Sequence, residues 1–301
     1  MSYGEITKQD VLVQGEIIFS EPTAPINDNP FKKCCYDLNV FADSADSDSL
    51  KNDNSNIIKI IPKQYTVSMN LQKLVSGSWA TQAALTDNTY GTFYAQGFES
   101  KGNNDYIGYA LSWRTVLSGF GTGRYRIQFD AGSSNEFYSE EYCLRNYSAL
   151  AIDGSVRIKY LWNSVIGDKN QKLQRDFAGI NWWNEIRLMP TIFGFKSGSF
   201  ESEQVRYQNG KERSISKGFR EEYQMIIKQL PSELHDVVVN DILMSDDIKI
   251  TDYNSQNAAS FVDVEVEVQG GYEPNYSDAR VYPNVTVNFI DKYDNRRKLY
   301  S

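Results

Sequence analysis

A tight turn between two strand-like stretches is the feature of this 301-residue sequence that most limits what it can fold into. The turn signal is Asn209-Gly210, inside the polar stretch Gln204–Lys211. These two residue types suit the positive φ angles of a two-residue hairpin turn. After the turn, every second position carries one of the residues Phe219, Glu221, Tyr223, Met225 and Ile227. The sequence therefore predicts a chain reversal followed by a long strand with one buried face.

The segments around this hairpin complete a β-rich C-terminal half. An aromatic block begins at Trp182-Trp183, and strands are predicted at 248–250, 261–268 and 281–290, with a loop over 269–278. Between the hairpin and 248–250, one helix is predicted over about 232–244. Its start is Pro231-Ser232-Glu233, and its apolar face consists of Leu234, Val237, Val238 and Ile242.

The N-terminal half is a series of short strand candidates separated by turns. Strands are predicted over 9–19, 57–61, 65–71, 106–117, 124–129, 138–147 and 156–160. Pro62 interrupts the second and third of these, and Asp153-Gly154 is predicted as a hairpin turn. Residues 43–56 form a polar run that we expect to stay in solvent as a flexible loop.

These patterns predict a mainly β fold of two antiparallel β-sandwich or jelly-roll-like modules, the C-terminal one with a single flanking α-helix. The expected organisation is an N-terminal strand and flexible arm (1–56), a first module (57–166) and a second module (167–301). The boundary is placed at the charged stretch 167–176.

Charge and hydropathy narrow the class of protein. A net charge of −8 disfavours a nucleic-acid binder that works by phosphate neutralisation, and it disfavours docking on anionic lipid. No apolar run approaches the ~20 residues of a membrane span, and Met1–Glu5 has no signal-peptide pattern. We therefore expect a soluble protein made in a cytoplasm, with no sequence-specific nucleic acid and no membrane among its partners.

Three cysteines are too few, and too oddly spaced, for a disulfide framework. They are Cys34, Cys35 and Cys143. Reduced thiols are the favoured interpretation, and a bridge between Cys143 and either neighbour is the alternative.

Four sets of residues have types that occur in functional sites. Asp46 and Asp48 lack the glycine and the closing glutamate of a calcium loop. Gly119, Gly121 and Gly123 lack the lysine and helix of a phosphate-binding loop. Asp263, Glu265 and Glu267 alternate with valines, as the solvent face of a strand does. His235, the only histidine, has no nucleophile motif beside it. We therefore expect no catalytic, cofactor-binding or metal-binding residues, no cofactor and no enzymatic activity.

The tryptophans allow a binding interpretation. They are Trp79, Trp113, Trp162, Trp182 and Trp183. Such rings can form a flat platform for sugars or an anchor in a protein interface, although most are expected in the core.

The segments from Cys143 to Tyr253 resemble a known group of proteins. They are CLRNYSALAIDGSVRIKYLWN, DFAGINWWNEIRL, the QNGKER hairpin and DIKITDYN, together with the long strand and the helix beginning at Pro231. In order and character they resemble virion structural proteins of tailed phages that infect Bacteroidetes, the crAss-like group included.

The resemblance implies a non-enzymatic tail or neck component, a homo-oligomer forming a ring or tube layer in contact with other virion tail or portal proteins. Its location would be the virion, assembled in the host cytoplasm. The alternative is a carbohydrate-binding, adhesin-like β-module that contacts host surface glycan, and a third interpretation is a glycoside hydrolase with two carboxylates across a cleft.

Overall fold

Strands dominate the computed structural model and helices are few, which confirms the mainly β fold expected from the sequence. The described residues are 17–18, 38–62, 68–86, 88–96, 104–130, 136–139, 141–162, 165–167, 174–176, 182–230, 234–235, 237–253, 261–275, 282–293 and 295–298, and all structural statements below concern them. The predicted strand over 9–16, Cys34, Cys35 and the helix start at Pro231–Glu233 lie outside this set.

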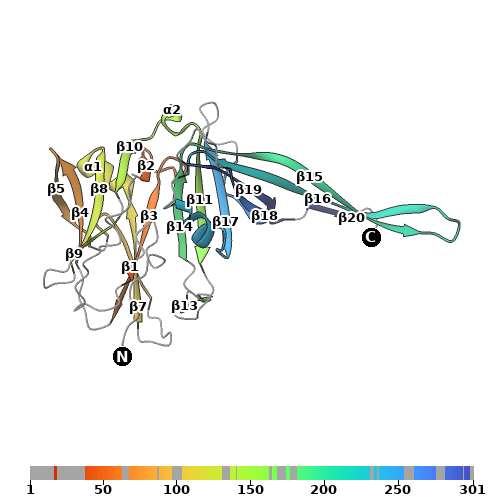
Figure 1. The fold of residues 1–301 in the computed structure, drawn as a ribbon, viewed down its shortest axis with the longest axis horizontal. Helices are drawn as coiled ribbons and strands as arrows, with labels where there is room; N and C mark the ends of the chain where they lie inside the picture. The colour runs from red at the N-terminus through yellow and green to blue at the C-terminus, as the bar shows by residue number, and fades with distance from the viewer. Residues whose placement is uncertain are drawn as a thin grey trace.

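The N-terminal strands form two sheets on one side of the molecule (Figure 1). The first has the order β1-β3-β7-β6 and consists of β1 (Ile17–Ile18), β3 (Asn54–Pro62), β6 (Gly91–Gln96) and β7 (Asn104–Ser112). The second is a mixed sheet with the order β2-β10-β8-β4-β5 and with β9 beside β8. Its strands are β2 (Leu38–Ala42), β4 (Ser68–Val75), β5 (Ser78–Ala84), β8 (Gly123–Asp130), β9 (Glu136–Tyr138) and β10 (Tyr142–Asn146). It is mixed because β2 runs parallel to β10.

The strands predicted over 57–61 and 124–129 are confirmed as parts of β3 and β8, and the strand predicted over 65–71 is described from Ser68 as β4. The stretch 76–92 was not predicted to form strands. Ser76 (φ 49°) and Gly77 (φ 83°) make a two-residue turn with both φ angles positive, and this turn pairs β4 with β5.

The strand predicted over 106–117 is wrong in its second half, because residues 113–120 form the helix α1 (Trp113–Phe120). Trp113, Val116 and Leu117 are buried and recur at helical spacing, so a helix, rather than a strand, puts all three in the core. Gly121, with φ 73°, ends the helix. The glycine-rich stretch 119–123 is therefore the end of a helix and the start of β8.

Asp153-Gly154 is not a hairpin turn, as the sequence suggested. It joins the short helix α2 (Ala149–Ile152) to strand β11, and the Ser148 hydroxyl caps this helix by accepting a hydrogen bond from the Ala151 amide. Gly154 adopts φ 69°, which explains the glycine signal.

The C-terminal strands form one eight-stranded antiparallel sheet with the order β14-β11-β17-β18-β19-β16-β15 and with β20 beside β16. Its members are β11 (Ser155–Trp162), β14 (Trp182–Leu188), β15 (Thr191–Arg206), β16 (Glu212–Ile227), β17 (Asp247–Tyr253), β18 (Val264–Asn275), β19 (Asn284–Asp291) and β20 (Asn295–Lys298). A separate pair consists of β12 (Val165–Gly167) and β13 (Gln174–Asp176). Strand β11 precedes the predicted module boundary at residue 167, but it pairs with β14 and β17, which follow that boundary. The division of the chain into domains stays a prediction.

The loop prediction over 269–278 is wrong for its first part. Residues 269–275, expected in a loop, continue β18 through a bulge at Gln269–Gly271, where Gly270 adopts φ 82°. A second strand that the sequence analysis did not predict is β20, which pairs with β16. In both places the backbone gains partners from a neighbouring strand that local composition does not reveal.

The predicted helix over 232–244 is present at 234–235 and at 237–242, but its second part is the π-helix η3 (Val237–Ile242) and not an α-helix. The Leu243 amide donates to the Val238 carbonyl, a hydrogen bond over five residues. Leu234, Val238 and Ile242 are buried, as their spacing predicted.

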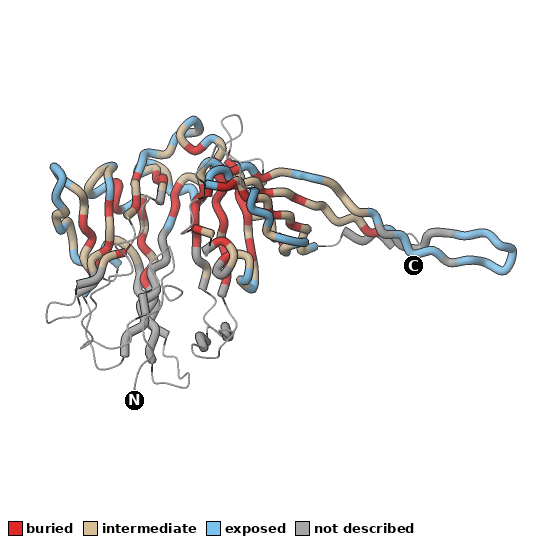
Figure 2. The backbone as a smooth tube through the Cα atoms, in the orientation of Figure 1, coloured by how far each residue is buried: buried red, intermediate tan, exposed pale blue. Residues whose placement is uncertain are grey.

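One hydrophobic core runs through both groups of strands (Figure 2). It contains Leu71, Tyr109 and Trp113 from the N-terminal elements together with Ile158 and Phe289 from the eight-stranded sheet. These five side chains are completely buried. The body of the molecule is therefore held by apolar packing across the sheets.

Candidate functional site

A long ribbon made by β15 and β16 projects from the body of the molecule (Figure 1). Each strand has 16 residues. At about 3.3 Å per residue, each extends roughly 50 Å. The hairpin predicted at 204–211 is confirmed as its tip, with the Gly210 amide donating to the Tyr207 carbonyl at 2.9 Å.

The turn itself differs in detail from the prediction. Gly210 has φ 78°, but Asn209 is not among the residues with positive φ. The Asn209 side chain instead accepts a hydrogen bond from the Lys211 amide at 3.1 Å. This is a three-residue loop with a single left-handed residue, the longer alternative to the expected two-residue turn.

Near the body, the ribbon is anchored by aromatic packing. The Phe193 ring lies 5.2 Å from that of Tyr223 and 5.6 Å from that of Phe261, measured between centroids. Phe193 and Tyr223 are buried. The face of the ribbon that carries them is called the core-side face below.

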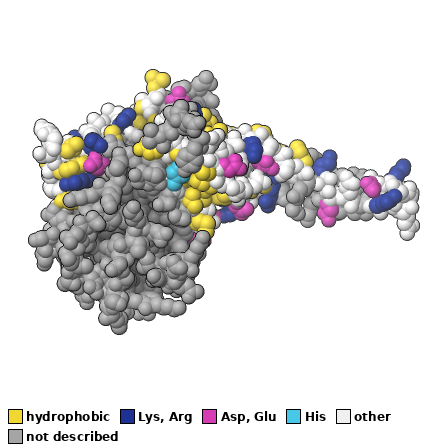
Figure 3. Space-filling view, viewed as in Figure 1, with side chains coloured by type: hydrophobic (Ala, Val, Ile, Leu, Met, Phe, Trp, Pro, Cys, Tyr) yellow, Lys and Arg dark blue, Asp and Glu magenta, His cyan; other side chains and the backbone are white. Residues whose placement is uncertain are grey.

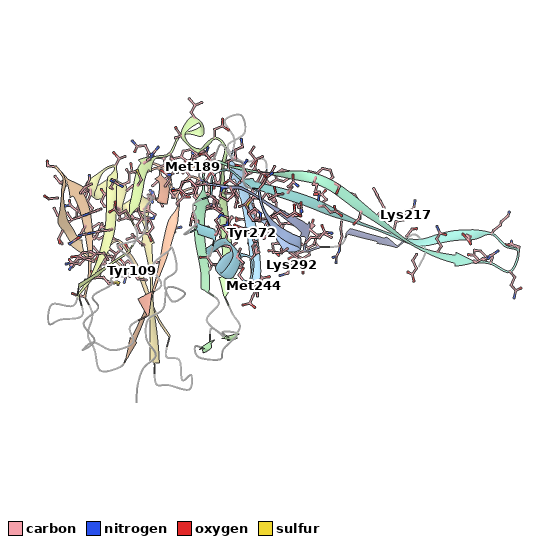
Figure 4. All side chains as sticks on the ribbon, in the orientation of Figure 1. Tyr109, Met189, Lys217, Met244, Tyr272 and Lys292 are labelled. Carbon is pink, nitrogen blue, oxygen red and sulfur yellow. The ribbon has the colours of Figure 1, made fainter. Side chains whose placement is uncertain are left out.

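Beyond Phe195 the ribbon leaves the body, and its core-side face is no longer covered. A bulge at Lys196 shifts the register, so that the pairs on this face become Gly198 with Glu221, Phe200 with Phe219, and Ser202 with Lys217. Figure 2 shows that exposed residues predominate toward the tip, and Figure 4 labels Lys217 on this outer part.

Two phenylalanines form an apolar patch on the outer ribbon. The rings of Phe200 and Phe219 are 4.6 Å apart, and Phe200 is 81% exposed. Phe219 lies across Gly198, where a Cβ atom would come within 2.2 Å of its Cε2 atom. The ring of Phe219 thus covers the glycine backbone, and Phe200 stands out from the surface. A side chain of this size in solvent suits an interface better than a monomer surface.

The tip is basic compared with the rest of the chain. From Ser202 to Lys217 it contains four basic and two acidic residues, in a chain of net charge −8; the basic ones are Arg206, Lys211, Arg213 and Lys217. Tyr207 at the turn is 49% exposed. Figure 3 shows basic side chains at the tip of the ribbon, and both basic and acidic ones along the rest of it. The outer ribbon therefore offers aromatic and charged groups without contributing to the core.

At the opposite end of β15, a buried ionic cluster holds the N-terminal region against the eight-stranded sheet. Arg187 donates from Nε to Asp53 Oδ2 at 2.8 Å and from Nη2 to Asp53 Oδ1 at 2.5 Å. Its Nη1 donates to the Ser155 hydroxyl at 2.8 Å, and Asp53 also accepts from the Phe41 amide at 2.8 Å. The Arg187 guanidinium lies 4.3 Å from the centre of the Tyr253 ring. Burial alone would lower the pKa of Arg187, but the charge of Asp53 raises it above its ordinary value.

A second arginine and a glutamate complete this cluster. Arg157 donates to the Ser49 carbonyl at 2.7 Å and lies 3.9 Å from both Asp53 and Glu185. Glu185 accepts from the Asn54 amide at 3.2 Å. Burial raises the pKa of Glu185, and the charge of Arg157 opposes this shift. The cluster thus consists of paired charges with backbone partners, which suits a structural clamp.

The expectation that residues 43–56 remain in solvent is therefore wrong for part of the run. Asn52 and Asp53 are buried, and the Asn52 side chain donates to the carbonyls of Asp46 and Asp48. Asp46 is paired with Lys51 at 2.5 Å. The polar side chains build the loop's own hydrogen bonds, which composition alone could not indicate.

The other sequence candidates are placed apart from one another. The His235 Nδ1 atom is hydrogen-bonded to the hydroxyl of Tyr272, and the two rings meet edge to face. Asp263 is paired with Lys159 at 3.2 Å, and Glu265 with Lys249 at 2.7 Å. Lys249 belongs to β17, beside β18, and Lys159 belongs to β11, one strand further away in the same sheet. These carboxylates therefore take part in ion pairs with lysines of the sheet. Among the residues that the structure describes, no three histidine, cysteine or acidic side chains gather as a metal site.

The tryptophans do not form a common platform among the described side chains. Trp113 is fully buried, whereas Trp79 and Trp183 are partly exposed. The Arg126 guanidinium lies 4.3 Å from the centre of the Trp79 ring and 3.7 Å from that of Tyr138. The side chains of Trp162 and Trp182 lie outside the described set. Cys143 is a partly buried free thiol.

Sequence reasoning missed both the ionic cluster and the phenylalanine patch. Asp53 lies 134 positions from Arg187 in the chain, so no local pattern could join them. Phe200 could have been found, because counting back from the predicted two-residue turn at Asn209-Gly210 places it opposite Phe219. In the structure a bulge between Glu203 and Gln204 compensates for the longer loop and gives the same pair.

No helix in the described part of the chain has the length and apolar character needed to cross a membrane. The sequence matches no known protein family, and a search of curated proteins gives no significant match.

Proposed function

We propose that this protein is a non-enzymatic structural subunit of a tailed-phage virion, which forms an oligomeric ring or tube layer in the tail or neck. In this proposal the two groups of strands are β-sandwich modules that make a rigid body. The ribbon is the arm through which one subunit reaches another. Its partners are further copies of itself and other tail or portal proteins.

The observation that carries the proposal is the exposed outer ribbon. Its residues add nothing to the core, yet Phe200 is 81% exposed and Tyr207 is 49% exposed. A monomer gains no stability from such a projection, whereas a subunit of an assembly can bury it against a neighbour. The resemblance of the segments from Cys143 to Tyr253 to phage virion proteins points the same way.

The charge of the chain supports the same interpretation. A net charge of −8 suits a channel or layer past which DNA slides, because an acidic wall repels the phosphates that a basic wall would hold. The buried pair of Asp53 and Arg187 would keep the body rigid while the ribbon engages a neighbour.

Light scattering on the purified full chain, with negative-stain imaging of the same fractions, tests the proposal. The expected result is closed rings or tubes, either at all protein concentrations or only at high concentration. A strictly monomeric chain that also fails to bind portal and tail proteins would rule it out.

One observation favours the alternative of a glycan-binding module. On the outer face of the mixed sheet, Arg126 lies between the rings of Trp79 and Tyr138, beside Gln72 and Gln128. Aromatic rings with amide groups at their rim suit sugars. In this case host polysaccharide should change the tryptophan fluorescence of a monomer, and Trp79→Ala should remove the change.

A further inference from the structure

The core-side face of the outer ribbon is apolar at its centre and oppositely charged at its two ends. At the centre are Phe200 and Phe219. Two residues toward the tip, the same face of β16 carries Lys217, and two residues toward the body it carries Glu221. Lys217 is exposed and Glu221 is partly exposed.

This arrangement is complementary to itself. Consider a second ribbon stacked on this face, with its β16 strand running antiparallel to the first. If the two-fold axis passes between the two Phe219 side chains, each Lys217 lies opposite the other copy's Glu221. We propose that two copies of this chain pair through this face, with the Phe200 and Phe219 rings of both at the centre. The inference rests on the proposed function and names the surface that the ribbon meets.

The dimensions of the contact are reasonable. Packed sheets lie about 10 Å apart, a gap that a lysine and a glutamate can span together. Next to Phe200 on this face of β15, the space over Gly198 is filled by the ring of Phe219, whereas Ser202 is small and leaves room for the partner's Phe200. Phe195, which lies on β15 between Phe200 and the body, is 56% exposed. In the paired arrangement it contacts the outer part of the other ribbon.

A two-fold contact joins subunits in pairs and cannot close a ring by itself. In the proposed assembly it therefore links subunits of two facing layers, while contacts of the body close each layer. The face is narrow, so an isolated pair should be weak, and the many pairs between two layers would add to one another.

Sedimentation equilibrium on the full chain, at protein concentrations up to about 1 mM, tests the pairing. A contact with a dissociation constant above about 1 mM would be too weak to count as a specific pairing. The wild type should associate in pairs. Phe200→Ser and Lys217→Glu should each weaken this association about tenfold or more, because one loses the apolar centre and the other places two acidic groups together. The double variant Lys217→Glu/Glu221→Lys should regain it, because the exchanged charges again face each other across the axis.

Arg220→Glu is the matched control. Arg220 is on the same strand but on the opposite face, so this variant makes the same charge change and should pair as the wild type does. A wild type that does not pair by 1 mM, an unaffected Phe200→Ser variant, an equal loss in Arg220→Glu, or no recovery in the double variant would each overturn the pairing.

Negative-stain images separate this inference from the proposed function. Double layers in the wild type and single layers in Phe200→Ser support both. Identical particles in the two proteins remove the pairing and leave the ring proposal standing. Pairs without any larger assembly support the pairing and contradict the ring.

Discussion

Asp53 and Arg187 show how single residues connect distant parts of this chain. Both are buried, and they form two parallel hydrogen bonds of the kind that guanidinium and carboxylate groups make best. The hydroxyl of Ser155 and the amide of Phe41 satisfy further positions around them. Removing one partner would therefore leave a buried charge without its counter-ion.

Arg187→Ala should lower the free energy of unfolding by about 3–5 kcal/mol, the usual cost of breaking a buried pair. Urea denaturation followed by tryptophan fluorescence measures this change. Lys51→Ala, which removes a surface pair with Asp46, is the control and should leave the midpoint nearly unchanged. Equal small effects of the two substitutions would mean that Asp53 stays solvated.

Glu185 gives the stability a pH dependence of predictable sign. Burial raises the pKa of its carboxyl, so the folded protein binds this proton more tightly than the unfolded chain does. Its contribution to stability is complete below the unfolded pKa of about 4.3 and is lost as the pH rises through the folded pKa.

Glu185→Gln removes this titration while keeping an oxygen that can accept from the Asn54 amide. The stability of the wild type relative to this variant should therefore be highest near pH 4 and should fall toward pH 8. Urea denaturation of both proteins at several pH values gives this difference. A difference that stays constant or rises with pH would show that Arg157 outweighs the burial of Glu185.

At the scale of elements, the ribbon divides into an anchored half and an exposed half. The anchored half packs Phe193, Tyr223 and Phe289 together. The exposed half has only its own cross-strand pairs and the short pairing of β16 with β20. The same two strands therefore serve the core at one end and a surface at the other.

Replacing residues 204–215 by a two-residue Asn-Gly turn keeps Glu203 opposite Ser216. It should leave the stability of the body within about 1 kcal/mol of the wild type, because exposed residues far from the core contribute little. Circular dichroism and thermal unfolding check this expectation. If the deletion lowered the free energy of unfolding as much as Arg187→Ala does, the tip would have to pack on the body of the same chain.

At the scale of the whole molecule, the apolar core does not stop between the two groups of strands. Trp113 and Tyr125 belong to the same buried cluster as Ile158 and Val287. The ionic cluster around Arg187 adds a second connection between the two groups of strands. We therefore expect the body to unfold as one unit.

Calorimetry of the full chain should show a single transition with equal van't Hoff and calorimetric enthalpies. The measurement also examines the predicted division at residue 167. Two separate transitions would show that the modules fold independently in spite of their shared core.

The sequence by itself determined the class of the fold and the hairpin, because alternation and turn residues act over a few positions. The period of two from Phe219 to Ile227 defined one face of β16, which is buried at Tyr223, Met225 and Ile227, and Gly210 indicated the turn. Leu234, Val238 and Ile242 were likewise correct as one buried helical face.

Only the tertiary structure decided how these elements are joined. Local pattern favoured a strand through Trp113, Val116 and Leu117, but a helix buries all three residues. Composition favoured solvent for Asp53, but Arg187, distant in the chain, compensates its burial. Phe219 was predicted on the buried face of a strand, but the body ends before it, and it lies beside the exposed Phe200. Each of these outcomes depends on contacts between residues far apart in sequence, which no local pattern contains.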